Sequence, residues 1–308
     1  MNSINHGMLF GINIKTNIDL PVMFPFVSDV SSNEKEVMYH NECIDDLEDY
    51  DMYAHNERKY VFYRYNRKKE AYMIETEMTG NVVVNRNSIH YYSDNFNNKH
   101  AYLLSFGMGL AMMLRLNGFV VFHANSLSLN GHTLMVMGPS GAGKSTLCSN
   151  LVKNYGAELI SDDMTCINVQ TNQLYTGFPV MKLWPSTLSE IFQKKAMNYK
   201  TVGGNEKVYF PICNHSKAIF HHADRVVILQ PSENNATIEN MSTKQLLCKT
   251  IKHIYNKPSL DNLALCSEMN SIVNIITSNN IKGYLVNNPH SYESLNGMCD
   301  KLVYSVLQ

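Results

Sequence analysis

The fold of this chain of 308 residues is decided by the stretch Gly138, Pro139, Ser140, Gly141, Ala142, Gly143, Lys144, Ser145, Thr146. From Gly138 to Ser145 it matches every required position of the phosphate-binding loop G-x-x-x-x-G-K-[ST]. The glycines let backbone N–H groups approach phosphates, the Lys144 ammonium can reach the outer phosphates, and the Ser145 hydroxyl can ligate Mg²⁺. We therefore expect the chain to bind ATP with Mg²⁺.

The residues on both sides of this loop agree with that interpretation. Residues 134–137 are apolar and precede the loop, and residues 145–155 predict a helix whose N-terminus points at the phosphate charge. The alternative is a glycine-rich turn that merely joins a strand to a helix. A phosphate-binding loop alone does not separate a kinase from a motor, a switch or a transporter ATPase.

Composition excludes several other classes of protein. A hydrophobic content of 44% with 17% charged residues is typical of a globular protein with a sizeable core, of one large domain or two. The formal net charge of −1 gives no support to a nucleic-acid partner. The seven cysteines include no CxxC pair, which argues against a disulfide framework and a zinc site.

We expect a cytoplasmic protein without a membrane partner. No charged and then apolar leader opens the sequence. The longest apolar run, around residues 102–114, is too short to span a bilayer and is followed by Arg115.

Residues 1–98 predict a small β-rich N-terminal region, and residues 99–308 a catalytic domain. The first region contains short alternating stretches, such as residues 60–65 and 81–84, bounded by Asn, Asp and Gly. Basic residues between positions 58 and 69 alternate with tyrosines. They are a solvated strand face or, alternatively, a surface for an acidic partner.

A β-hairpin is predicted directly before the phosphate-binding loop. Residues 99–117 predict a helix, and strands at 119–129 and 133–137 flank Asn130-Gly131-His132, a turn in which Asn-Gly tolerates positive φ. Well over a hundred residues therefore precede the loop, whereas most small-molecule kinases of this type carry it on a first strand near the N-terminus.

Two adjacent carboxylates, Asp162 and Asp163, follow a predicted strand at residues 157–161. Open α/β sheets bind ligands at the carboxyl ends of their strands. One aspartate can hold Mg²⁺ and the other can accept a proton from an attacking hydroxyl, unless the pair is an ordinary acidic turn. Since adjacent strand residues point to opposite faces, we expect only one of them to reach the acceptor.

The remaining elements predict a structural C-terminal part. The sequence indicates helices at residues 186–195, 246–256 and 260–277, with a capping box at 242–245, a central strand at 224–229, a short strand at 284–286 and a terminal helix from about residue 291. The pair His221-His222 has no carboxylate or Cys at ligand spacing, so a metal site is not expected there.

Taken together, three motifs resemble one family. His123 in Phe122-His123-Ala124, the phosphate-binding loop, and Ser161-Asp162-Asp163 look like the catalytic domain of HPr kinase/phosphorylase and of the shorter HPr-kinase-like proteins, including kinases that tailor ribosomally made peptides. The resemblance covers about residues 115–230. The run 182–185, Lys-Leu-Trp-Pro, is similar to the kinase-like branch.

The resemblance implies a role for each matching residue. Lys144 would stabilise the transferred phosphate, and Ser145 would ligate Mg²⁺ together with Asp162. The family's catalytic base falls on Asp163 if the extra residue near Tyr155 is an insertion at the helix end, and on Asp162 if it is not; we favour Asp163. His123 would orient the aspartate or a phosphate oxygen; outside this resemblance, a lone strand histidine is usually a packing residue.

One departure from the family bears on the substrate. The Glu-Ile-Arg-Gly signature of true HPr kinase/phosphorylases is absent after Asp163, which argues against HPr as substrate and against phosphorolysis. Lys182, Trp184, Glu206 and Lys207 become candidates for contacts with the acceptor or the nucleotide. Residues 203–207 predict a flexible loop, and such loops often close over phosphates.

The sequence thus predicts an α/β protein with a P-loop kinase domain of the HPr-kinase/phosphoenolpyruvate-carboxykinase-like type. We expect it to transfer the γ-phosphoryl group of ATP to a hydroxyl, namely a serine of a peptide or small protein. A small-molecule acceptor, or a nucleotide-binding regulator without phosphoryl transfer, are the alternatives. The preference for ATP over GTP leaves no mark in the sequence. The resemblance to HPr-kinase-like proteins also implies self-association as a homo-oligomer, an expectation that the missing signature weakens.

Overall fold

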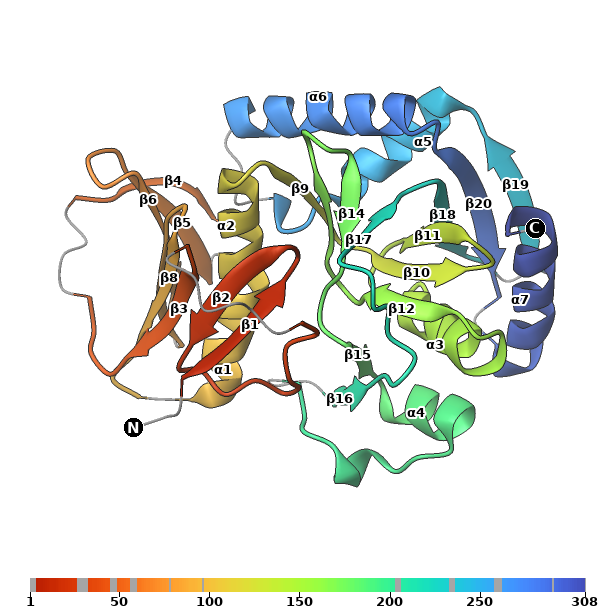
Figure 1. The fold of residues 1–308 in the computed structure, drawn as a ribbon, viewed down its shortest axis with the longest axis horizontal. Helices are drawn as coiled ribbons and strands as arrows, with labels where there is room; N and C mark the ends of the chain where they lie inside the picture. The colour runs from red at the N-terminus through yellow and green to blue at the C-terminus, as the bar shows by residue number, and fades with distance from the viewer. Residues whose placement is uncertain are drawn as a thin grey trace. The chain divides into compact units, whose positions relative to one another are not determined.

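The computed structural model describes residues 4–26, 33–44, 49–55, 60–77, 79–95, 97–202, 206–232, 236–257, 262–289 and 291–307. The chain divides into two compact units (Figure 1). Unit 1 comprises Met1–Phe119 and Asn256–Glu268, and unit 2 comprises Val120–Tyr255 and Met269–Gln308.

Unit 1 is built on an eight-stranded sheet of order β1-β2-β3-β8-β7-β6-β5-β4. Its strands are β1 (Asn5–Leu9), β2 (Ile12–Thr16), β3 (Lys35–His40), β4 (Asp51–His55), β5 (Val61–Asn66), β6 (Ala71–Thr76), β7 (Gly80–Val84) and β8 (Ser88–Tyr92). Alternate residues of the central strands, such as Val82, Val84 and Ile89, are fully buried, as one covered sheet face requires.

A helical segment covers that face of the sheet. It consists of α1 (Asn98–Leu103), a π-helical turn (Leu104–Gly109) and α2 (Leu110–Leu116), which confirms the helix predicted at residues 99–117. A Cβ on Gly109 would lie 3.0 Å from Ile89 Cγ2 and 3.2 Å from Val82 Cγ1, so the helix backbone lies directly on β7 and β8. The division between the units therefore falls at Phe119, later than the boundary of 98/99 expected from the sequence.

The basic strand face of unit 1 contacts acidic side chains of the same unit. Arg64 Nε donates to Glu75 Oε2 at 2.6 Å, and Lys69 Nζ lies 3.9 Å from Asp49 Oδ2. Arg58 and Lys59 lie outside the described residues. Two of the basic side chains are thus paired within unit 1.

Unit 2 contains a six-stranded sheet of order β12-β10-β11-β18-β20-β19. Its strands are β10 (Asn125–Leu129), β11 (His132–Met137), β12 (Glu158–Ser161), β18 (Arg225–Pro231), β19 (Thr237–Met241) and β20 (Lys282–Asn288). The middle strands β11, β18 and β20 are parallel, whereas β10 and β19 pair antiparallel with their neighbours. The predicted central strand at residues 224–229 is confirmed as β18.

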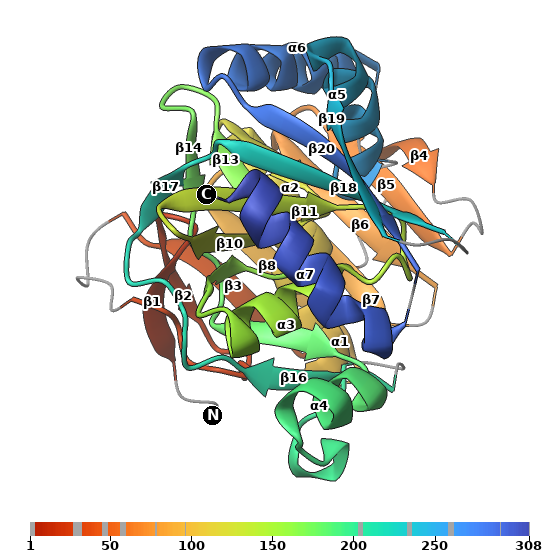
Figure 2. The same cartoon turned by 90° about the vertical axis from the view of Figure 1, so that its right-hand side faces the viewer.

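Helices cover both faces of this sheet. On one face lie α3 (Lys144–Asn154) and α7 (Tyr292–Val306), as Figure 2 shows, and on the other lies α5 (Thr243–Thr250). Two adjacent residues of β20 face the two opposite sides of the sheet. Gly283 faces Leu246 of α5, and Tyr284 packs into the core formed with α3 and α7.

The predicted hairpin is confirmed. β10 and β11 pair antiparallel, and Asn130 and Gly131 between them have φ of 53° and 79°. The helix predicted after the phosphate-binding loop is confirmed as α3. The strand predicted at residues 157–161 is confirmed as β12, which pairs antiparallel with β10 and so runs in the same direction as β11.

The prediction of a single strand at residues 119–129 is wrong. Residues 119–129 do not form one strand but two, β9 (Phe119–Phe122) and β10, which belong to different sheets. At the break, His123 N donates to His253 O at 2.7 Å and Ala124 O accepts from Thr165 Oγ1 at 3.0 Å. Because other segments satisfy these backbone groups, the chain can leave one sheet and enter the next at His123.

β9 is an edge strand of the second sheet in unit 2, of order β17-β14-β13-β9. Its other strands are β13 (Thr165–Asn168), β14 (Gln173–Tyr175) and β17 (Phe220–His222). A separate two-stranded ribbon pairs β15 (Val180–Leu183) with β16 (Val208–Pro211).

The helices predicted in the C-terminal part are confirmed, with shifted ends. Pro185 opens α4 (Pro185–Phe192), which is followed by a 3₁₀ turn (Ala196–Asn198). The capping box of Ser242 and Gln245 begins α5. That helix stops at Thr250 instead of continuing to residue 256, because the next residues form a 3₁₀ turn (Ile251–His253) and then pair with β9.

The last elements are α6 (Asn262–Ser278), β20 and α7. Within unit 1, Arg115 Nε of α2 donates to Glu268 Oε2 of α6 at 3.1 Å, and both side chains are buried. Ser291 caps α7 by accepting from Glu293 N.

Candidate active site

The phosphate-binding loop joins β11 to α3, and its glycines are structurally required. Gly138 has φ of 154°, and a Cβ there would lie 2.7 Å from Leu229 O of the adjacent β18. Gly143 precedes α3 with φ of 90°. Only glycine adopts these conformations without strain, so the sequence pattern and the backbone agree.

Lys144 lies folded back over its own loop. Its side chain is buried, and Nζ donates to Gly138 O at 2.9 Å and to Pro139 O at 3.2 Å. Burial lowers the pKa of Lys144, while the charges of Asp163 and Asp162 act to raise it. A buried ammonium group that donates to two carbonyl oxygens is well prepared to bind phosphate oxygens instead.

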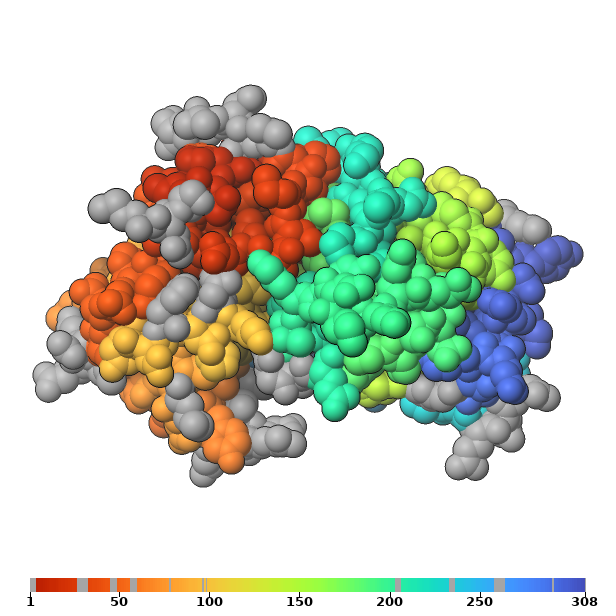
Figure 3. Space-filling view, turned by 90° about the horizontal axis from the view of Figure 1, so that it is seen from below, coloured from red at the N-terminus to blue at the C-terminus, as the bar shows by residue number. Residues whose placement is uncertain are grey.

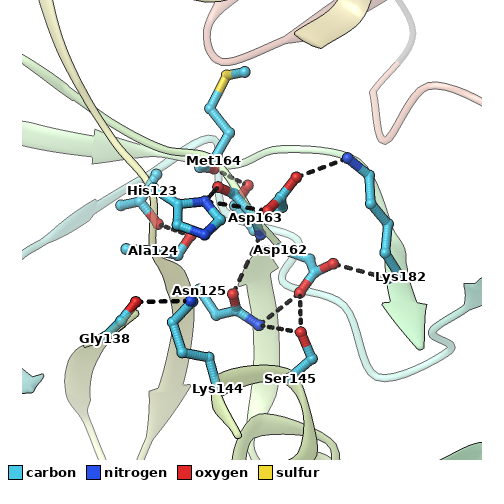
Figure 4. Close-up of polar contacts among 12 residues, drawn as sticks. His123, Ala124, Asn125, Gly138, Lys144, Ser145, Asp162, Asp163, Met164 and Lys182 are labelled. Carbon is cyan, nitrogen blue, oxygen red and sulfur yellow. Dashed lines mark hydrogen bonds and ion pairs between the residues drawn. The ribbon is translucent and has the colours of Figure 1, made fainter. Parts of the chain in front are cut away.

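Asp162 lies next to Ser145. Ser161, the last residue of β12, pairs with Ser126 of β10, which brings Asp162 beside Asn125. The Ser145 hydroxyl lies 3.5 Å from Asp162 Oδ1, as Figure 4 shows. The fold therefore brings together the two side chains that the sequence suggested as ligands of Mg²⁺.

Two donors fix the Asp162 carboxylate. Asn125 Nδ2 donates to Oδ1 at 2.5 Å, and the backbone N–H of Lys182 donates to Oδ2 at 2.8 Å. Burial, followed by the negative charge of Asp163, raises the pKa of Asp162 to about 6. A cation beside this carboxylate would offset the free-energy cost of ionising it in a buried position next to Asp163.

The donor atoms at this position fit Mg²⁺. Mg²⁺ prefers hard oxygen ligands and is usually held by one or two protein oxygens together with phosphates and water. Ser145 Oγ and the Asp162 carboxylate supply two such oxygens. Within the part of the chain that the structure describes, no group of three or more His, Cys, Asp and Glu side chains could hold a metal ion.

Asp163 points away from Ser145. Its φ of 66° is left-handed, a conformation that Asp tolerates better than most residues. Lys182 Nζ lies 2.8 Å from Asp163 Oδ2, and His123 Nδ1 lies 3.2 Å from Oδ1. Both aspartates lie beyond the end of β12. Their side chains are therefore separated by this turn, and not by the alternating side-chain directions of a strand that the sequence suggested.

The same two neighbours set the charge of Asp163. Burial alone would raise the pKa of Asp163, but the Lys182 ammonium and the His123 ring outweigh this effect and hold the pKa well below its usual range. About 30% of the side chain remains exposed. The site thus presents one ionised, accessible carboxylate beside one that is held against Ser145.

His123 contributes through the break between β9 and β10. Besides its contact with the Asp163 carboxylate, its Nδ1 lies 3.1 Å from Asp163 O, and its ring centroid lies 6.1 Å from that of Tyr255. When Nδ1 carries the proton, it donates to Asp163. His123 can therefore reach Asp163 because the chain leaves the sheet of β9 at this residue, before β10 begins.

Of the other sequence candidates, Lys182 bonds to the aspartates, and Lys207 acts on Asp162 through its positive charge, which counteracts part of the rise that burial causes in the pKa of that carboxyl group. Lys182 contacts both aspartates, one through its side chain and one through its backbone. Lys207 Nζ lies 5.5 Å from the ring centroid of Trp184, which is 46% exposed. Glu206 is exposed, and residues 203–205 of the predicted flexible loop lie outside the described residues.

Sequence reasoning missed two residues of the site. Asn125 is 1% exposed and bonds to Asp162, and a buried Asn on an apolar strand was the signal that could have revealed it. Burial, together with the positive charges of Lys144 and His123, lowers the pKa of His253 to about 4. No local pattern marks His253, because only the tertiary fold brings it close to the loop.

Comparisons with known proteins point to the same domain class. The sequence profile of the family described as ABC transporter matches residues 123–261, less than half of the chain. The matched range contains the phosphate-binding loop, His123 and both aspartates. The loop and this match identify a P-loop NTPase-like domain within an α/β protein.

Curated protein sequences yield no match to this chain. Among solved structures, the chain is similar to the HPr(Ser) kinase/phosphatase from Coxiella burnetii, at 13% sequence identity and a TM-score of 0.33, over 61% of this chain and 96% of that chain. A TM-score this low carries no argument about this protein. Among the described residues, no helix is both long and apolar enough to cross a membrane.

Proposed function

We propose that this protein is an ATP- and Mg²⁺-dependent kinase that transfers the γ-phosphoryl group to a hydroxyl, namely that of a serine in a peptide or small protein. The observation that carries the proposal is the Asp163 carboxylate, which is ionised and partly exposed beside the Ser145–Asp162 pair. A carboxylate in this position can accept the proton of an attacking hydroxyl.

Nucleotide binding would begin with the loop and Lys144. The backbone N–H groups at the start of α3 and the Lys144 ammonium would bind the phosphates, with Lys144 exchanging the carbonyl oxygens of Gly138 and Pro139 for phosphate oxygens. Ser145 and Asp162 would hold Mg²⁺, whose charge offsets that of the transferring group. Asn125 keeps the Asp162 carboxylate in place for this task.

Lys182 is suited to couple phosphate binding to the activation of Asp163. Its ammonium pairs with Asp163 and makes that carboxylate a weak base. A γ-phosphate at the loop competes for the same ammonium. Once Lys182 turns to the phosphate, the pKa of Asp163 rises and its oxygen becomes available to the acceptor, while His123 still orients the carboxylate.

A peptide serine is the acceptor that we favour. The run of residues 182–185 resembles the kinase-like branch of the HPr kinase family. Within it, the exposed ring of Trp184 lies two residues after Lys182 in the chain. An exposed aromatic ring offers a contact surface to an extended peptide. A metabolite kinase would use the same catalytic residues, so the acceptor has to be identified by experiment.

A second candidate function is ATP hydrolysis without an acceptor. The match of residues 123–261 to the ABC transporter family favours it, since phosphate-loop domains of many kinds hydrolyse nucleotides. The paired aspartates would then hold Mg²⁺ and orient a water molecule. This function predicts release of inorganic phosphate and no phosphorylated product.

Intact-mass spectrometry tests the proposal. The purified protein is incubated with Mg-ATP and with peptides and small proteins from its native host or encoded beside its gene, and Lys144→Ala serves as the control. We expect a phosphoryl mass gain on a serine with the wild-type protein alone. ATP loss without a modified polypeptide would point to a metabolite acceptor or to hydrolysis, and no ATP loss would contradict the proposal.

A further inference from the structure

A small pocket adjoins the phosphate-binding loop within unit 2. Its volume is about 110 Å³. It is lined by Gly143, Thr146, Asn288, Ser291, Tyr292 and Leu295. None of these side chains is charged, and they combine an aromatic ring and an apolar side chain with hydroxyl and amide groups. The pocket therefore offers a chemistry quite different from that of Lys144, Lys182 and the two aspartates.

The order of strands puts this pocket on the opposite side of the loop from the aspartates. β11 leads into the loop, and the strand order across the sheet is β12-β10-β11-β18-β20. β12 and β20 therefore lie on opposite sides of β11, each two strands away from it. Asp162 and Asp163 follow β12, whereas Asn288 ends β20 and Ser291 is the N-cap residue of α7. Two strand spacings, about 10 Å, separate β20 from β11.

The first turn of α3 shows the same separation. Ser145 points to Asp162, at 3.5 Å, whereas Thr146 Oγ1 lies 3.1 Å from Thr187 Oγ1 of α4. Consecutive helix residues diverge by about 100°, so the metal ligand and the pocket lie on different sides of the turn. A triphosphate with its outer phosphate at Asp163 therefore has its inner end at Thr146.

The pocket is held in shape by contacts from outside it. The Tyr292 hydroxyl lies 3.1 Å from Thr187 Oγ1 and 3.3 Å from Ser186 Oγ, both of α4, and Figure 3 shows the surface of α4, in green, adjoining that of α7, in blue. Asn288 Nδ2 donates to Ala142 O of the loop at 2.9 Å. Both side chains are thus positioned before any ligand arrives, which lowers the entropy cost of binding.

We propose that this pocket binds the nucleobase of the nucleotide whose phosphates lie on the loop; the inference rests on the nucleotide binding proposed above. Its volume is well below the roughly 300–1,000 Å³ of sites that enclose a whole ligand, so it suits one ring system. Its neutral lining suits a base and not a phosphate. The Tyr292 ring would stack on the base, and the loop end of β20 would contact the polar edge of the base.

Isothermal titration calorimetry with two probes tests this assignment. The probes are Mg-ATP and the Mg complex of ribose 5-triphosphate, which lacks only the base. Stacking of a base on an aromatic side chain contributes about 1–3 kcal/mol, so Tyr292→Leu is expected to weaken ATP binding about 5- to 150-fold. The affinity for ribose 5-triphosphate should stay within about twofold, since the phosphate contacts remain.

Two variants serve as controls. Tyr304→Leu makes the same change on α7 at a residue that is 73% exposed and outside the pocket, and both affinities should match the wild type. Tyr292→Phe keeps the ring and should lose less ATP affinity than Tyr292→Leu. An equal loss for both probes in Tyr292→Leu, or no loss for ATP, would overturn the pocket assignment alone. A wild-type protein that binds neither probe would overturn the proposed nucleotide binding as well.

Discussion

Asp162 and Asp163 are neighbours in sequence, yet their pKa values move in opposite directions. Asp162 is held between Asn125 and the Lys182 backbone near Ser145, where burial raises its pKa to about 6. Asp163 lies between Lys182 Nζ and His123, which hold its pKa well below the usual range. Carboxylates with such different surroundings can take different tasks, and the roles that we propose are metal ligand for Asp162 and proton acceptor for Asp163.

We predict that substituting the two aspartates will have unequal effects. Asp163→Asn removes the proposed proton acceptor and should lower the proposed phosphoryl transfer by about 10²–10⁴-fold without loss of the fold. Asp162→Asn weakens the proposed metal ligand, so it should lose less activity and should raise the Mg²⁺ concentration needed for half-maximal rate. Initial rates measured across a Mg²⁺ titration would separate the two, with Lys144→Ala as the inactive control. Equal losses with unchanged Mg²⁺ dependence would show that the division of roles is wrong.

A pH dependence follows from the raised pKa of Asp162. Between the usual value of 3.8 and about 6, the folded protein binds a proton that the unfolded chain does not, so stability falls as the pH rises through this window. Mg-nucleotide should recover that loss, because it binds only the ionised carboxylate. We therefore expect Mg-ATP to raise the melting temperature more at pH 7.5 than at pH 5.

Differential scanning calorimetry at the two pH values would measure this effect. Asp162→Asn removes the titrating group and provides the matched control, so most of the difference between the pH values should disappear in that variant. A wild-type stabilisation by Mg-ATP that is the same at both pH values would contradict the assignment of Asp162 as the metal ligand.

At the scale of elements, the sequence predicted the helices of unit 2 and the strands β11, β12, β18 and β20 because their signals are local, but it predicted no strand at β13–β17 or β19. The glycine pattern of the loop, the Asn130-Gly131 turn and the capping box of Ser242 each act within a few residues, and all three are confirmed. The break at His123 could not be predicted, since its backbone partners, His253 and Thr165, are far away in the chain. The roles predicted for His123 and the aspartates remain predictions.

Two glycines in unit 2 should respond oppositely to the same substitution. Gly297 lies exposed inside α7, and a Cβ there would meet nothing within 4 Å, so Gly297→Ala should stabilise the protein by about 0.5–1 kcal/mol. Gly138→Ala would create a 2.7 Å contact with Leu229 O at a φ of 154° and should destabilise it by roughly 1–3 kcal/mol. Melting temperatures of both variants test this, and a rise for Gly138→Ala would contradict the close approach of the loop to β18.

At the scale of the whole molecule, the sequence anticipated a β-rich beginning but not where the two units divide. The helical segment at residues 98–116 packs on the sheet of unit 1 through Gly109, and Arg115 pairs with Glu268, which lies 153 residues later. Amphipathic spacing predicts that a helix will bury one face, but it does not identify the sheet that will cover it. For this reason, the sequence alone could not predict that the units divide at Phe119.

The route of the chain through its two units determines when each can fold during synthesis. Unit 1 needs Asn256–Glu268, and unit 2 needs the last residues, including β20. Domains commonly fold as units, from the N-terminus, while the chain leaves the ribosome. Here, β18 can pair with its parallel neighbour β20 only after the intervening α5 and α6 have been made, so the parallel core of unit 2 is completed late in the synthesis of that unit.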